Sequence, residues 1–411
     1  MRDDPKMSSG IRFLVAARRA EIHALEELAR TSELVSAIGL LVHALQKERG
    51  LSNVLLASGG SRGAAQRLGQ VPESLRLERA LRERLDALDT HAPEALPNGA
   101  RLFSRIAVAL HLLDGLAAVR DAVARLALTA EQSTAAFVRA VGALLATVLQ
   151  AVDSAPDPTV SRELVATFHF MQGKELAGQE RALGAAAFAA WRIDAVGRAG
   201  WANLVEQQER CFESFASIAD ADALAAWQGS QPTARGAELE RLRRLGASLD
   251  GLGAPRGDVG DAWFALCTDR IDAMQAVERV LAERLRTLCE ARIAEARREL
   301  EDQQAILEAL RREAQESDGV AAATIGPRLA GSVLELLHAQ ARRLQAMSDE
   351  LEAVRATLHE RKVVERAKGL LMASRRLSEE DAHRLLRETA MNQHRKLTEV
   401  AASVLAMAEF L

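Results

Sequence analysis

Residues 40–56 read LLVHALQKERGLSNVLL, and this stretch predicts the character of the whole chain. Apolar residues recur three or four positions apart, as at Ile38, Leu41 and Leu45, which is the spacing of one face of an α-helix, and Leu56 falls on the same face. Arg49 falls on that same apolar face. A guanidinium in such a place is costly to bury unless a negative group meets it there.

Two kinds of partner for Arg49 are open. The first is an internal carboxylate, either Glu48 from a neighbouring turn or an acid on another helix, and spacing alone favours it. The second is a small anion held inside a helical bundle. A planar guanidinium keeps its proton and offers parallel N–H donors, so it suits a flat oxyanion.

Composition predicts an all-α protein. The chain has 411 residues, of which 48% are hydrophobic, and it contains no tyrosine. Alanine, leucine, arginine and glutamate dominate, and no run of alternating β-branched residues suggests a sheet. The formal net charge of −4 means that any nucleic-acid site must be local. The three cysteines are widely spaced and have no histidine at ligand spacing, so no metal site is expected.

The helical pattern divides the chain into four parts. Residues 1–9 are expected to be a disordered tail, and residues 10–316 a helical domain of paired antiparallel bundles that ends in a long helix. The first two helices of that domain are predicted at 11–28 and 32–57. Small residues at 317–331 indicate a linker. The remainder, 332–411, is predicted to be a long helix, partly coiled coil, followed by a three-helix module.

Three segments resemble the NIT domain, the nitrate- and nitrite-sensing module of bacterial regulators. They are LQKERGLS at 45–52, KELAGQERA at 174–182 and LERLRR at 239–244. The resemblance implies a helical sensor in which arginines bind nitrate or nitrite. The residues that it singles out are Arg49, Arg181 and Arg243, with Arg241 and Arg244 as alternatives to Arg243 in this basic run.

Two charged neighbours of Arg181 are open to a simpler interpretation. Lys174 and Glu180 are expected either to pair structurally with Arg181 or to form a solvated helix edge. Arg120, in the segment LAAVRDAV, lies where the family often carries a Leu-Arg pair, but this match is short.

Residues 355–405 resemble the ANTAR domain, the RNA-binding output of antitermination regulators. The hallmarks are AKGLLM at 367–372, EDA at 380–382, LLR at 385–387 and RKL at 395–397. The resemblance implies binding to RNA stem-loops through a basic helical stripe whose affinity falls with salt. Its expected members are Arg361, Lys362, Lys368, Arg375, Arg376, Arg395 and Lys396. Leu371, Met372 and Leu386 are expected in the core.

Together the two resemblances predict a cytoplasmic regulator in which nitrate or nitrite controls the binding of leader RNA with paired stem-loops, so that a terminator does not form. No other cofactor is expected. The amino terminus lacks an apolar segment of signal-peptide or membrane-spanning kind, so no membrane partner is expected, and the chain is predicted to be a homodimer. The alternative is a helical scaffold with a structural arginine network and no ligand. Enzyme chemistry is not indicated, because no nucleophile with a base, metal motif or carboxylate pair is recognisable.

Overall fold

The computed structural model describes residues 5–88, 99–250, 257–316, 322–375, 377 and 379–408. Within these ranges the regular structure is helical, apart from one isolated bridge between Arg192 and Asp250. The helices of the amino-terminal half are α1 (Pro5–Ala57), α2 (Ala64–Asp86), α3 (Gly99–Ala124), α4 (Ala130–Ser154) and α5 (Pro158–Ala190). Those that follow are α6 (Ala195–Ile218), α7 (Ala221–Gly229), α8 (Thr233–Ala247), α9 (Gly257–Glu316), α10 (Ala322–Arg375), α11 (Glu379–Asn392) and α12 (Leu397–Ala408). The prediction of an all-α fold is confirmed.

The first helix is longer than the sequence suggested. α1 runs without a break from Pro5, so residues 5–9 are helical and the predicted break between residues 28 and 32 is wrong. The reason lies in the two hydroxyl residues at the expected boundary. Thr31 and Ser32 donate their hydroxyl hydrogens to the carbonyl oxygens of Glu27 and Leu28, four residues earlier. Bonded back in this way, they continue the helix instead of capping a new one.

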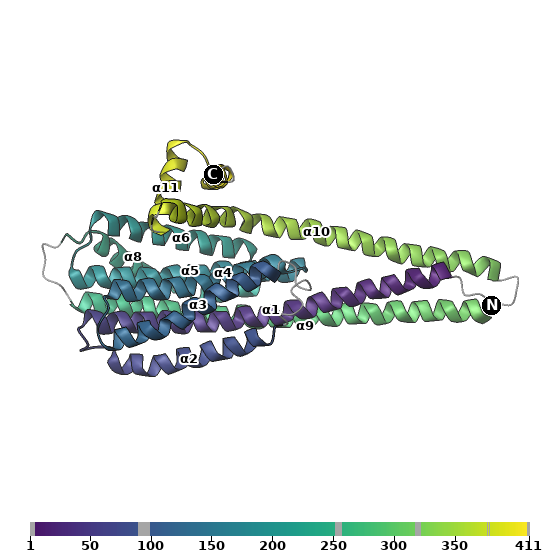
Figure 1. Cartoon of the computed structure of the whole chain (residues 1–411), viewed down its shortest axis with the longest axis horizontal. Helices are drawn as coiled ribbons and strands as arrows, with labels where there is room; N and C mark the ends of the chain where they lie inside the picture. The colour runs from purple at the N-terminus through teal and green to yellow at the C-terminus, as the bar shows by residue number, and fades with distance from the viewer. Residues whose placement is uncertain are drawn as a thin grey trace. The chain divides into compact units, whose positions relative to one another are not determined.

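The first 345 residues form one unit built from two groups of helices. In the first group α1 packs against α2, α3 and α4, and α3 packs against α4. In the second group α5 packs against α6, α8 and α9, and α7 and α8 also contact α9. Contacts of α1 with α9 and of α4 with α5 join the groups (Figure 1). This arrangement buries α5 on nearly all sides and lays it against α1.

The two longest helices of this unit lie side by side for much of their length. α1 and α9 pack together, and Arg297 of α9 donates to Glu26 of α1 with an Nη2–Oε1 distance of 2.6 Å. Figure 1 shows the purple α1 and the green α9 continuing beyond the other helices of the bundles. α10 begins at Ala322, so much of the predicted linker at 317–331 is helical, while residues 317–321 lie outside the described ranges.

Residues 346–411 form the second unit, described here by itself. Its core is made by the carboxyl-terminal part of α10 together with α11 and α12. Leu371 and Leu386 are buried in it, as predicted, together with Ala382 and Val400. The side chain of Met372 lies outside the described residues. The predicted three-helix module is therefore present.

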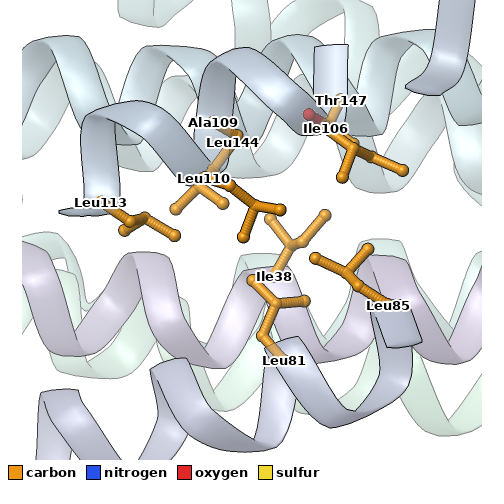
Figure 2. Close-up of a pocket in the computed structure, with 9 residues that line it drawn as sticks. All are labelled: Ile38, Leu81, Leu85, Ile106, Ala109, Leu110, Leu113, Leu144 and Thr147. Carbon is orange, nitrogen blue, oxygen red and sulfur yellow. The ribbon is translucent and has the colours of Figure 1, made fainter. Parts of the chain in front are cut away.

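Three helices are long and apolar enough, by length and composition, to cross a membrane: Arg12–Ala57 within α1, all of α3, and Ala130–Asp153 within α4. The expectation that the amino-terminal region lacks such a segment is corrected by this finding. These helices pack on one another, and part of their apolar surface forms the core of the first group. Figure 2 shows a pocket in this core, lined by hydrocarbon side chains from α1, α2, α3 and α4 and by Thr147. A lining without charge does not suit an inorganic anion.

Candidate functional site

Arg49 of α1 is fully buried and meets a carboxylate from a distant helix. Its Nη1 donates to Oε1 of Glu175 over 2.5 Å, and its Nη2 to Oε2 over 3.3 Å. Glu175 lies on α5 and is 2% exposed, and it also accepts from the amide nitrogens of Gln46 and Gln179. The expectation of a buried arginine on an apolar stripe is confirmed. Of the carboxylates considered, the partner is an acid on another helix and not Glu48.

Arg181 of α5 lies at the same junction, and its hydrogen-bond partners are neutral. Its Nη2 donates to the carbonyl oxygen of Gln46 over 2.9 Å, and its Nη1 to the hydroxyl of Thr268 on α9 over 3.1 Å. The ring centroid of Phe264 is 5.0 Å from its guanidinium carbon. Burial and repulsion from Arg49 lower the pKa of Arg181 to about 10, so the side chain remains charged at pH 7.

Two glycines let the arginines approach the opposite helix. A β-carbon on Gly178 of α5 would lie 2.5 Å from Nη2 of Arg49, and one on Gly50 of α1 would lie 2.7 Å from Nη2 of Arg181. Each arginine therefore rests on a glycine of the facing helix. The glycine in each signature segment supplies room for the guanidinium of the other segment, which explains why both signatures carry one.

Arg243 is the inward-facing member of its basic run. Its Nε and Nη2 donate to the two carboxylate oxygens of Glu180 over 2.7 and 2.8 Å. Arg241 and Arg244 are exposed, and Arg241 pairs with Glu238. The guanidinium of Arg243 thus joins α8 to α5, whereas those of Arg49 and Arg181 lie at the junction of α1 and α5.

Glu180 is the centre of a second buried charge cluster. It is 1% exposed and accepts from Trp201 and Gln208 of α6 as well as from Arg243, with Arg270 of α9 at 3.7 Å. Burial alone would raise the pKa of Glu180, but hydrogen bonds and charge from Arg243, with smaller contributions from Arg270 and Gln208, hold that pKa below its ordinary value. The carboxylate is therefore ionised at pH 7.

Lys174 is also part of the core and not a solvated edge. Its fully buried amino group donates to Gln275 and Glu278 of α9. The nearby His43 is held uncharged, because burial and the charge of Lys174 lower its pKa to about 3. Lys174 and Glu180 thus pair with residues other than Arg181, which leaves Arg181 as the cation without a contacting carboxylate in the described part of the site.

Arg120 has a structural partner that the sequence analysis did not assign. It donates through Nε and Nη2 to Glu48 over 2.8 and 3.1 Å, and its side chain is 9% exposed. Arg67 in turn donates to the carbonyl oxygen of Arg120 and to the hydroxyl of Ser52. The one signal in the sequence was the Leu-Arg match around Arg120. The ion pair between Arg120 and Glu48 is thus a second buried ion pair, next to Arg49 on the side of α1 that faces α3.

The basic residues expected to bind RNA have different surroundings in the carboxyl-terminal unit. Arg375, Arg395 and Lys396 are exposed, whereas Lys368 is 6% exposed beside the core residue Ala367. Lys368 is thus far less accessible than a phosphate-binding residue was expected to be. Arg361 and Lys362 belong to α10, but their side chains lie outside the described residues, as does the whole of Arg376.

A buried arginine pair in a helical bundle, together with a separate three-helix unit that exposes Arg375, Arg395 and Lys396, fits a ligand-controlled RNA-binding regulator. The family model described as nitrate and nitrite sensing matches residues 40–286, and the ANTAR domain model matches residues 352–405. The chain therefore belongs to the family of nitrate- and nitrite-sensing antitermination regulators that join a NIT domain to an ANTAR domain.

Two relatives cover nearly the whole chain. The nitrate regulatory protein of Klebsiella oxytoca is 34% identical over 408 residues, which are 96% of this chain and 94% of that protein. The solved structure of the NasR transcription antiterminator is similar, with a TM-score of 0.60 and 33% identity, over 98% of this chain and 99% of that one. The chain is thus a nitrate-responsive antitermination regulator and not an enzyme.

Proposed function

We propose that Arg49 and Arg181 together hold nitrate or nitrite where α1, α5 and α9 meet. The observation that carries this proposal is the charge of the junction. Two buried guanidinium groups rest on facing helices. The carboxylate of Glu175 contacts Arg49, and no carboxylate of the described residues contacts Arg181. One cation of the pair is therefore uncompensated. A planar anion of single charge would balance it and would accept from several N–H groups at once.

Arg243 enters this proposal through Glu180 and not as a direct ligand. Glu180 and Arg181 are neighbours on α5, and the ion pair between Glu180 and Arg243 fixes that turn of the helix against α8. Such a contact orients the adjacent Arg181 toward α1. This role keeps Arg243 within the site while its own charge remains paired.

The anion is proposed to control RNA binding by the carboxyl-terminal unit. Binding favours whichever packing of α1, α5 and α9 gives the ligand more contacts, and a ligand shifts an equilibrium only by that difference in affinity. The favoured packing allows two copies of the chain, as a homodimer, to bind the paired stem-loops of a leader RNA. The bound RNA then does not form a terminator. This binding takes place in the cytoplasm, where leader RNA is made. Exposed Arg375, Arg395 and Lys396 are the described candidates for phosphate contacts.

The experiment that tests this function measures binding of the purified full chain to a leader RNA with two hairpins, at fixed ionic strength. Nitrate, nitrite and chloride are compared. We expect binding to strengthen with nitrate or nitrite relative to chloride. Equal binding in all three salts would remove the switch. If no nitrate binding and no RNA binding occurred, the alternative of a scaffold with a structural arginine network would be preferred.

The glycine at position 178 offers a direct test of the arginine site. We expect Gly178→Ala to weaken the nitrate-induced rise in melting temperature strongly, because the new methyl group would displace the guanidinium of Arg49 from the place where the anion is proposed to bind. Alanine stabilises a helix by about 1 kcal/mol relative to glycine, and this gain offsets much of the stability that the clash with Arg49 removes. Gly142→Ala on α4 is the matched control, since a β-carbon there meets nothing within 4 Å. An unchanged nitrate response in Gly178→Ala would contradict the assignment of Arg49.

Arg395 and Lys396, the exposed basic residues just before α12, offer a test of the RNA face. The double variant Arg395→Ala, Lys396→Ala is expected to weaken binding of every RNA sequence similarly and to reduce the salt dependence of log K by about one for each lost phosphate contact. Binding is measured by fluorescence anisotropy over a range of potassium salt. Arg384→Ala serves as the control, because Arg384 is exposed on α11 and pairs with Asp381. Equal salt slopes for the double variant and the parent chain would exclude these two residues.

A further inference from the structure

The carboxylate of Glu175 presents to Arg49 the same kind of acceptor as the ligand. Its two oxygens lie 2.5 and 3.3 Å from Nη1 and Nη2 of the guanidinium. Carboxylate, nitrate and nitrite are all flat, carry one negative charge and spread that charge over oxygen atoms. Glu175 therefore occupies the N–H edge of Arg49 that a planar anion would use.

The surroundings of Glu175 are those of a bound anion. Besides Arg49, the amide nitrogen of Gln46 donates to Oε2 over 2.8 Å, and that of Gln179 donates to Oε1 over 3.0 Å. The carboxylate is 2% exposed, so water contributes little to its solvation. Three side chains from two helices thus form a preformed cradle of N–H donors around a trigonal group.

The charges at the junction decide whether the ligand and Glu175 can share Arg49. Neighbouring charges are already matched, because Lys174 pairs with Glu278 and Glu48 pairs with Arg120. An anion placed against Arg49 while Glu175 stays would set two negative groups side by side in a buried site, where repulsion is poorly screened. The ligand gains both guanidinium groups only if the carboxylate leaves.

We propose that Glu175 is an internal competitor of the ligand: in the ligand-free protein its carboxylate fills the anion cradle of Arg49, and nitrate or nitrite binds by displacing it. This inference rests on the proposed function and adds to it that the carboxylate of Glu175 stabilises the ligand-free state. A displaced carboxylate at this depth must find new partners, so its release requires α5 to repack against α1. Ligand exchange on Arg49 is thereby coupled to helix packing.

The exchange also accounts for the choice of ligand. To displace the carboxylate, an anion must accept from two N–H donors of one guanidinium and from the amides of Gln46 and Gln179. A flat oxyanion offers two oxygens that match the two parallel N–H groups of the guanidinium, whereas chloride offers a single acceptor atom. The exchange is therefore expected to discriminate by shape against chloride.

The test is the isosteric variant Glu175→Gln in the full chain, with nitrate binding measured by isothermal titration calorimetry. Removing the competing charge is expected to tighten nitrate binding by about tenfold to a hundredfold. Without ligand, the variant is expected to have a lower melting temperature than the parent chain, because Arg49 loses its counter-charge. Nitrate is expected to raise the melting temperature of the variant back to that of the parent chain. Glu48→Gln is the matched control. It removes a buried carboxylate of α1 that pairs with Arg120, and binding should tighten far less.

The outcomes separate the two proposals. Weaker or unchanged nitrate binding in a folded Glu175→Gln, with normal binding by the parent chain, would overturn the exchange and make Glu175 a positioning residue for Arg49. Absence of nitrate binding by the parent chain would instead overturn the proposed function. If Glu175→Gln does not fold, Glu175→Asp is used. Its shorter carboxylate reaches Arg49 less well, so binding should again tighten, and weaker binding would again overturn the exchange.

Discussion

Replacing Arg181 with methionine is expected to abolish the nitrate response while changing the free energy of unfolding by no more than about 2 kcal/mol. The hydrogen-bond partners of Arg181 are a helix carbonyl and a hydroxyl, and burial together with Arg49 already lowers its pKa. A buried cation without a contacting anion gives little net stability, since desolvation offsets its hydrogen bonds. The ligand loses the one charge that nothing else at the junction neutralises.

Arg49→Met is the variant with which Arg181→Met is compared. It should also abolish the response, but it leaves the buried carboxylate of Glu175 without its cation and should destabilise the protein by about 3–5 kcal/mol. Urea unfolding without ligand and thermal melting with and without nitrate measure the two effects. The reverse order of stability, with Arg181→Met the weaker protein, would contradict the charge balance inferred for the junction.

A loss of stability of about 3–5 kcal/mol at neutral pH is expected for Glu180→Gln, because the variant leaves Arg243 and Arg270 without a buried counter-charge. The pKa of Glu180 in the folded protein is held below its ordinary value, with the cations outweighing burial. Its ionised form therefore stabilises the fold fully at pH values above the pKa of the unfolded chain, about 4.3. This contribution is lost as pH falls through the lower pKa of the folded state.

The measurement is the difference in unfolding free energy between the parent chain and Glu180→Gln at several pH values from 7 downward. We expect the difference to be large at pH 7 and to shrink in acid, where the parent carboxyl group becomes protonated. Glu238→Gln is the control, because Glu238 is exposed and pairs with Arg241 on the surface of α8. It should change stability little at any pH. A difference for Glu180→Gln that does not vary with pH would mean that its charge is unimportant.

The sequence predicted which residues face inward better than it predicted their partners. Arg49 was placed in the core by the period of its neighbours, and this placement is local information that a helix preserves. Its partner Glu175 lies 126 residues further on, so the pair depends on how α1 and α5 pack. The same limit applies to Glu180 and Arg243, which are 63 residues apart. Lys368 was expected on a binding face because it belongs to a stripe of basic residues, but such a stripe does not show whether each member is exposed, and Lys368 is buried.

Local signals that compete with one another explain the remaining differences. Ser32 was interpreted as the start of a helix, but its hydroxyl bonds back to Leu28 and α1 continues. At Thr129, by contrast, reciprocal hydrogen bonds with Gln132 form a capping box at the start of α4. The two cases differ in whether the preceding residues are already helical, which a short sequence window does not determine.

The length of α9 has a mechanical consequence. Thr268, which accepts from Arg181, lies near the start of this 60-residue helix, and Glu316 at its other end is about 70 Å away along the axis. If the helix pivots as a stiff rod about its end near Thr268, a tilt of about 2° swings the far end through about 2.5 Å, by the same rise per residue. α9 would then act as a lever. A movement smaller than an atomic diameter near the anion would become, at the far end of α9, a displacement about as large as the radius of the helix backbone.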